Sequence, residues 1–219
     1  MTTAALTTTP ERLPYVGPTL RSIVAQHGVE WVLLLVESDL VDDAKAATAP
    51  YEKVKVCPVP NIGPGKKHLT RCFFEPDEIV VTFDDDHCYL PDHAAQLISA
   101  VETGSVAGFV GQRNDLSTVL EGPADWINGA QSWAYRAGWL DPNEVMQWGR
   151  RSECCWTDDI YIGAMFRREG RPIRVVRASD EYRLPPANVG AWVHTTSLRL
   201  HPERTARDAA CMRAVANRF

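Results

Sequence analysis

Residues 79–92 read IVVTFDDDHCYLPD, and this stretch decides the fold. It begins with five apolar or β-branched residues, the composition of a strand buried within a sheet. Three carboxylates follow at once, Asp84, Asp85 and Asp86. In an open sheet of parallel strands, ligands bind in the crevice beyond the carboxyl ends of the strands. The stretch therefore predicts a central strand that delivers three acids to a binding crevice.

Three adjacent carboxylates repel one another, and folding alone does not require them, so we expect a cation to compensate them. Alternate side chains of an extended segment point the same way, so Asp84 and Asp86 can converge while Asp85 faces elsewhere. A hard divalent cation prefers oxygen ligands and leaves positions open for phosphate oxygens. The stretch thus predicts a cation site, and the alternative is a solvated acidic turn.

Apolar strand patterns alternate with helix patterns along the chain, which predicts an α/β fold with a mostly parallel central sheet flanked by helices. The expected strands are residues 4–9, 31–36, 54–59, 79–83, 106–110 and 173–176. The expected helices are residues 10–26, 69–75, 91–101, 141–148, 158–169 and a last one from about residue 202. Residues 42–49 are expected as a polar connection and residues 114–123 as an irregular loop.

The bulk properties exclude several classes of protein. A length of 219 residues suits one domain, and a net charge of −5 lacks the basic footprint of a nucleic-acid-binding protein. The six cysteines form no CxxC pair and no zinc pattern, so we expect reduced thiols and a cytoplasmic protein. We expect no signal peptide and no transmembrane segment, because no apolar run approaches the ~20 residues that span a bilayer.

Polar residues follow the first two expected strands as well. Thr8, Thr9 and Arg12 lie in the first strand-to-helix turn, where hydroxyls and a guanidinium suit phosphate or nucleotide contact. A helix cap and a surface arginine would give the same pattern. Glu37 follows the second strand, at the same expected crevice.

Residues 61–67, NIGPGKK, contain two glycines that let the backbone approach a ligand closely. Lys66 or Lys67 can supply a positive charge to a phosphate. The GxxxxGK[ST] spacing of a P-loop is missing, so the alternative is a plain loop with two solvated lysines.

A second acidic centre lies in residues 156–163, WTDDIYIG. Thr157 is expected as the N-cap of a helix that ends at Gly170, with Asp158 and Asp159 in its first turn. Adjacent helical residues diverge by about 100°, so one acid can serve structure while the other points into the crevice. The helix dipole keeps such a carboxylate ionised and able to act as a base.

Residues 126–136, WINGAQSWAYR, mix aromatic side chains with small and amide residues. Aromatic faces beside hydrogen-bonding groups suit a sugar ring, whose C–H face is apolar and whose rim is polar. The alternative is an amphipathic strand that uses its tryptophans as core.

Taken together, these motifs resemble glycosyltransferases with the A-type fold. VTFDDDHCYLPD is similar to the DxD segment of that family. GPGKKHL, NGAQSWAYR and WTDDIYIG with its downstream Gly170 fall in the family's order, and TTTPERLPYVGPTLRSIVAQ is similar to its usual opening. The resemblance spans about residues 6–176 and is closest to the exostosin-like or family-2-like branches.

The resemblance implies a single three-layer α/β/α domain, with a nucleotide-binding half at residues 1–112, an acceptor and catalytic half at 113–180, and a C-terminal loop and helix at 181–219. It implies a Mn²⁺- or Mg²⁺-dependent transfer of a sugar from a nucleotide diphosphate sugar, expected to be UDP-linked, to an acceptor hydroxyl. The acceptor stays open between a glycan, a lipid carrier, a protein side chain and a modified nucleic-acid base. Inversion and retention also stay open.

The resemblance further implies roles for individual residues. The implied metal ligands are Asp86, Asp84 and His194, with His201 as the substitute for His194. The implied donor-binding residues are Thr8, Thr9, Arg12, Glu37, Lys66, Asp84, Asp85, Asn128 and Gly129. The implied catalytic carboxylate is Asp159, with Asp158 beside it.

Three other functions fit parts of the pattern. A haloacid-dehalogenase-type phosphatase also has a strand followed by DxD, but its nucleophile strand normally opens the domain. A non-catalytic nucleotide-sugar-binding module would not need Asp86 and Asp159. A nucleotidyltransferase would use a similar sheet, but its glycine-rich opening loop is missing from residues 4–20.

Overall fold

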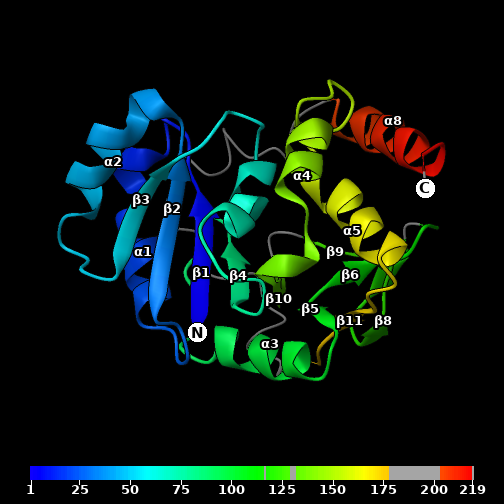
Figure 1. Ribbon diagram of the computed structural model, residues 1–219, viewed down its shortest axis with the longest axis horizontal. Helices are drawn as coiled ribbons and strands as arrows, with labels where there is room; N and C mark the ends of the chain where they lie inside the picture. The colour runs from blue at the N-terminus through cyan, green and yellow to red at the C-terminus, as the bar shows by residue number, and fades with distance from the viewer. Residues whose placement is uncertain (116, 129–131, 178–202, 219) are drawn as a thin grey trace.

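The computed structural model describes residues 1–115, 117–128, 132–177 and 203–218 (Figure 1). An eight-stranded sheet runs in the order β3 (Val54–Pro58), β2 (Trp31–Val36), β1 (Thr2–Thr7), β4 (Ile79–Phe83), β10 (Ala134–Arg136), β5 (Val106–Gly108), β11 (Ile173–Val175) and β8 (Gly122–Pro123). A small sheet holds β7 (Thr118–Val119), β6 (Gly111–Gln112) and β9 (Trp126–Ile127).

The α-helices are α1 (Gly17–Val24), α2 (Val41–Thr48), α3 (His93–Glu102), α4 (Pro142–Gly149), α5 (Asp158–Arg168) and α8 (Arg204–Ala216). The 3₁₀ turns are η1 (Leu13–Tyr15), η2 (Ser38–Leu40), η3 (Gly65–Cys72) and η5 (Ala137–Trp139). Within the described residues, no helix combines the length and the apolar character that crossing a bilayer requires.

The first half of the chain builds the parallel part of the large sheet. Strands β3, β2, β1 and β4 are parallel neighbours, and β11 runs parallel to β5. Between these two groups, β10 pairs antiparallel with β4 and with β5. The predicted mostly parallel α/β sheet is therefore confirmed, with β10 inserted antiparallel at its centre and β8 antiparallel to β11 at one end.

Alternation along the strands gives the sheet two buried faces, as a period of two requires. Leu6 and Val81 belong to the core under α1, α2 and α3. Ala5 and Val80, their neighbours in sequence, belong to the other core, with residues of η3, α4, α5 and α8. The protein is thus a three-layer α/β/α domain, as predicted.

Four expected elements were wrong in extent or kind. The helix expected over residues 10–26 is confined to α1, because Pro14 belongs to η1 and Pro18 lies in the first turn of α1. The expected polar connection at residues 42–49 is helix α2, which buries Ala44 and Thr48. The expected loop at 114–123 contains β7 and β8, and the helix expected at 69–75 is the 3₁₀ turn η3 instead.

The expectation of reduced thiols is wrong for two of the six cysteines. Cys154, just before α5, forms a disulfide with Cys211 in α8. The two lie 57 residues apart in sequence, so no short spacing motif marks them, and only the packing of α8 on α5 brings them together. Cys57, Cys72, Cys88 and Cys155 are free thiols.

Candidate functional site

The site lies where three neighbouring parallel strands end. Strand β1 ends at Thr7, β2 at Val36 and β4 at Phe83, and the pairing register brings these ends to one edge of the sheet. Thr8, Glu37 and Asp84 are the residues that follow, so all three lie at that edge. This is the edge at which open α/β sheets bind ligands.

Asp85 is turned inward from this edge and anchors the turn after β1. Its carboxylate accepts hydrogen bonds from Thr8 Oγ1 and from an Arg12 terminal nitrogen, both at 2.6 Å. Thr19 Oγ1 donates to the Asp85 carbonyl at 3.0 Å. Burial raises the pKa of Asp85, against the opposing effect of Arg12. Asp85 therefore lies outside the cluster that Asp84 and Asp86 form, although it shares the Arg12 guanidinium with Asp86.

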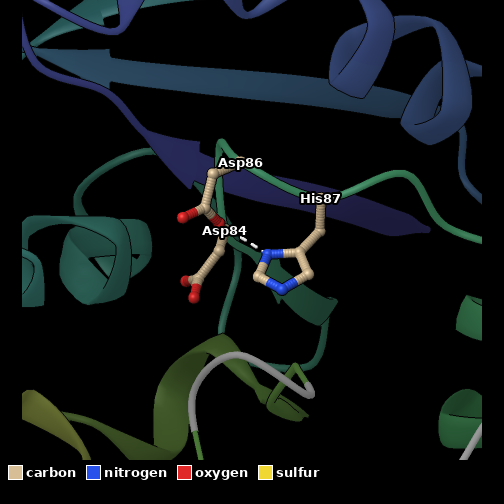
Figure 2. A group of neighbouring side chains, drawn as sticks. All are labelled: Asp84, Asp86 and His87. Atoms are coloured by element: carbon tan, nitrogen blue, oxygen red, sulfur yellow. Dashed lines mark hydrogen bonds and ion pairs between the residues drawn. The ribbon is translucent and has the colours of Figure 1, made fainter. Parts of the chain in front are cut away.

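Asp84, Asp86 and His87 form the candidate cation cluster. One ligand atom from each residue lies within 4.8 Å of the others (Figure 2). His87 Nδ1 is 2.5 Å from Asp86 Oδ1. Burial alone would raise the pKa of Asp86, but the hydrogen bond from His87 and the charges of His87 and Arg12 lower it, so the carboxylate stays ionised. Two carboxylates and an imidazole are a donor set that suits a divalent metal.

His87 was not among the predicted ligands. It directly follows the three acids, and this adjacency is the signal that could have identified it. Burial would lower the pKa of His87, but its hydrogen bond to Asp86 and the charges of Asp84, Asp86 and Asp85 raise it.

The two lysines of η3 are buried and paired with acids of the site. Lys66 Nζ forms an ion pair with Glu37. Lys67 Nζ lies 2.8 Å from Asp84 Oδ1 and 3.4 Å from Asp158 Oδ2. Lys66, predicted to contact phosphate, thus lies at the predicted edge with Glu37 as its partner. Lys67 joins the acids after β4 to the start of α5.

Asp158 and Asp159 begin α5 and diverge as predicted. Asp158 is buried, and its Oδ2 lies 3.5 Å from His68 Nε2 as well as near Lys67. Asp159 is half-buried and accepts a hydrogen bond from Trp133 Nε1 at 3.3 Å. Asp158 therefore interacts with the buried side chains of Lys67 and His68, and the carboxylate of Asp159 is the more accessible of the two.

Thr157 occupies the N-cap position of α5 but does not cap it with its side chain. Its hydroxyl donates instead to the Cys154 carbonyl at 3.3 Å. The predicted N-cap position is therefore confirmed, but the Thr157 side chain accepts no hydrogen bond from the first turn of α5.

The remaining predicted residues are placed as follows. Thr9 is exposed, and its carbonyl accepts the amides of Arg12 and Leu13. Asn128 is exposed, and its backbone amide donates to the Val110 carbonyl at 2.8 Å. Gly129, His194 and His201 lie outside the described residues.

The aromatic residues of the 126–136 segment belong to the core. Trp126, Trp133 and Tyr135 are buried in the cluster that packs against α5. The alternative that these tryptophans are core residues is therefore correct. The indole N–H of Trp133 donates to Asp159, and the Tyr135 hydroxyl lies 3.0 Å from Nδ1 of His68, which lies beside Asp158.

The sequence matches no protein-family model and no curated protein. Solved structures do share its fold. 4-Diphosphocytidyl-2C-methyl-D-erythritol synthase from Anaerococcus prevotii DSM 20548 superposes with a TM-score of 0.54 at 15% identity, over 83% of this chain and 88% of the synthase. S. aureus TarS 1-349 superposes with a TM-score of 0.57 at 14% identity, over 82% of this chain but 59% of TarS 1-349. At these identities the likeness shows the α/β fold alone.

Proposed function

We propose that this chain is a metal-dependent glycosyltransferase, which moves a sugar from a nucleotide diphosphate sugar, UDP-linked in the simplest case, to an acceptor hydroxyl. One observation carries the proposal. The Asp84–Asp86–His87 cluster lies at the carboxyl edge of the sheet and is linked through Lys67 to Asp158, which begins α5 directly before Asp159. Cation ligands and a candidate base are thus assembled from segments more than 70 residues apart in the sequence.

The residues present fit a divalent cation. Asp84 and Asp86 offer carboxylate oxygens and His87 offers an imidazole nitrogen, a set that binds Mn²⁺ or Mg²⁺. A cation bound by these residues would stabilise the negative charge that develops on a departing nucleoside diphosphate. Thr8, Arg12 and Glu37 at the same edge would bind the nucleotide part of the donor.

Asp159 is the candidate general base. Trp133 Nε1 donates to its carboxylate and fixes its orientation, while its place in the first turn of α5 favours the ionised form. In an inverting reaction it would take the proton of the acceptor hydroxyl as the new bond forms. In a retaining reaction it would only orient the acceptor or the donor.

A second candidate is nucleotidyl transfer, and the fold shared with the diphosphocytidyl-methylerythritol synthase favours it. Against it, residues 4–20 lack the glycine-rich opening loop with which such an enzyme binds phosphate.

The products separate the two reactions. Incubation with Mn²⁺ and a panel of UDP-, GDP- and CDP-sugars should release free nucleoside diphosphate, slowly by hydrolysis and faster with an acceptor. A nucleotidyltransferase would instead release pyrophosphate from CTP or UTP in the presence of a sugar or polyol phosphate. Release of inorganic phosphate from a simple phosphate ester, without any nucleotide, would favour a phosphatase. Failure to release nucleoside diphosphate from any donor would overturn the proposal.

A further inference from the structure

Lys66 and Lys67 are adjacent and equally buried, yet they serve different partners. Each is 3% exposed. Lys66 pairs with Glu37 after β2, whereas Lys67 pairs with Asp84 after β4 and with Asp158 at the start of α5. Only the second lysine therefore touches a residue of the Asp84–Asp86–His87 cluster.

The Asp84 carboxylate has two competing uses. In the free protein its Oδ1 binds the Lys67 ammonium at 2.8 Å. The same carboxylate is one of the three groups that could hold a divalent cation. Two cations that share one carboxylate repel each other, and in a buried site this repulsion is weakly screened by salt.

Lys67 has two acidic partners, because its Nζ lies 3.4 Å from Asp158 Oδ2 as well as 2.8 Å from Asp84 Oδ1. Because Asp158 is a second partner, the ammonium also keeps a counter-charge when Asp84 turns to another ligand.

We propose that Lys67 is an internal counter-cation that weakens divalent-cation binding to the free protein. The cation is then retained only together with a ligand that brings its own negative charge, such as a nucleoside diphosphate. This inference rests on the proposed function and adds to it an order of events, in which the cation and the diphosphate enter together. Lys67 is a positioning residue in this scheme and touches neither the sugar nor the acceptor.

The test is a titration of the protein with Mn²⁺ alone. Binding is measured by calorimetry and by the electron paramagnetic resonance signal of free Mn²⁺. Lys67→Gln should bind Mn²⁺ about tenfold more tightly than the wild type, as expected for removing one nearby charge. Lys66→Gln is the matched control, and its affinity for Mn²⁺ alone should stay within about twofold of the wild-type value. Lys67→Arg keeps the positive charge, so its Mn²⁺ affinity should resemble that of the wild type. When the titration is repeated with UDP present, the difference in Mn²⁺ affinity between Lys67→Gln and the wild type should become smaller.

Lys67→Gln leaves the buried Asp158 and the half-buried Asp84 without their cation, so its folding is checked by circular dichroism. If it does not fold, Lys67→Gln combined with Asp158→Asn is compared with Asp158→Asn alone, and the same tenfold gain is expected. Equal or weaker Mn²⁺ binding after the loss of Lys67 would overturn this inference, while donor cleavage that still required Mn²⁺ would leave the proposed function intact. Absence of Mn²⁺ binding in every variant, with and without UDP, would overturn both.

Discussion

The Asp86 carboxylate lies between the Arg12 guanidinium and the His87 imidazole, and its lowered pKa keeps it charged over the whole neutral range. Asp86→Asn keeps the shape of the side chain but removes that charge. We expect Mn²⁺ affinity, and with it Mn²⁺-dependent UDP affinity, to fall by at least about tenfold with the fold intact. Calorimetry measures both affinities.

The control for this variant is Asp92→Asn, which removes an exposed carboxylate that pairs with His27 outside the cluster. It should leave both affinities unchanged. Unaltered UDP affinity of Asp86→Asn in Mn²⁺ would remove Asp86 from the metal site.

Asp158 and Asp159 should give opposite phenotypes. Asp159→Asn keeps the hydrogen bond from Trp133 within reach but loses the base, so we expect near-normal donor binding and a kcat lower by about 10²–10⁴-fold. Asp158→Asn weakens the buried pair with Lys67, so we expect a loss of unfolding free energy of about 1–3 kcal/mol. Steady-state kinetics measure the effect of Asp159→Asn, and urea unfolding measures that of Asp158→Asn. A near-normal kcat of Asp159→Asn would show that Asp159 is not the general base.

His93 should make the protein sensitive to acid. Burial lowers its pKa to about 3, and its Nε2 lies 2.9 Å from Ser132 Oγ. Between about pH 6.5 and pH 3 the unfolded chain binds a proton that the native protein does not. The free energy of unfolding should therefore fall as the pH falls, by up to about 1.4 kcal/mol per pH unit.

This pH dependence is measured by urea unfolding between pH 4 and pH 7. His93→Gln should reduce the slope of the unfolding free energy against pH by the equivalent of about one proton. A smaller slope of the same sign should remain, because burial also lowers the pKa of His68. A slope unchanged by His93→Gln would show that another group takes up the proton.

At the residue scale, the positions of the acids could be predicted from the sequence, whereas the partners of the two lysines could not. Asp84, Asp86 and Asp159 stand out because carboxylates directly after an apolar strand or at a helix start have few structural explanations. Lys66 and Lys67 are adjacent, and only the 3₁₀ geometry of η3 decides which of them turns to Glu37 and which to Asp84. No pattern in the sequence distinguishes two neighbouring lysines in an irregular turn.

Among the elements, η3 depends on a close approach to α5. A Cβ atom at Gly65 would lie 1.8 Å from the Tyr161 hydroxyl oxygen. Gly65→Ala should therefore push η3 away from α5 and reduce the free energy of unfolding by about 1–3 kcal/mol. Because Lys67 belongs to η3, Mn²⁺ binding should change as well.

Thermal or urea unfolding tests this contact. Adding Tyr161→Phe should restore part of the lost stability, since it removes the atom that clashes. Gly17→Ala is the control, because a Cβ there would lie at an ordinary contact distance of 3.6 Å from the Tyr51 hydroxyl oxygen. Equal stability of Gly65→Ala and the wild type would contradict this packing.

Elements that bury a continuous apolar run could be predicted from the sequence, and those set by tertiary pairing could not. β2 and β4 appear where their runs predict them, because strands buried on both faces have few polar positions. Helix α2 was missed because its stripe consists of small residues such as Ala44 and Thr48. The antiparallel direction of β10 is a property of its neighbours β4 and β5, which no local pattern encodes.

At the scale of the whole molecule, helix α8 is attached to α5 by packing and by a disulfide. Figure 1 shows α8 beside α5, away from the parallel strands β1–β3. The Cys154–Cys211 disulfide links α8 to the segment just before α5. The Arg207 guanidinium of α8 also lies 4.3 Å from the ring centre of Trp156 in that segment. The segment just before Asp158 and Asp159 is thus held from the far end of the chain.

The disulfide should be visible by thiol titration of the unfolded protein. Four thiols are expected to react without reductant and six after reduction. Cys211→Ser should lower the free energy of unfolding by about 2–4 kcal/mol, because the unfolded chain regains the freedom of a long loop. Cys155→Ser changes a half-buried free thiol next to Cys154 and is the matched control, so it should lower the free energy of unfolding much less.

Because α8 packs on α5, Cys211→Ser should also loosen the helix that positions Asp159, so its kcat should fall further than that of Cys155→Ser. Six reactive thiols without reductant would show that α8 is held by packing alone.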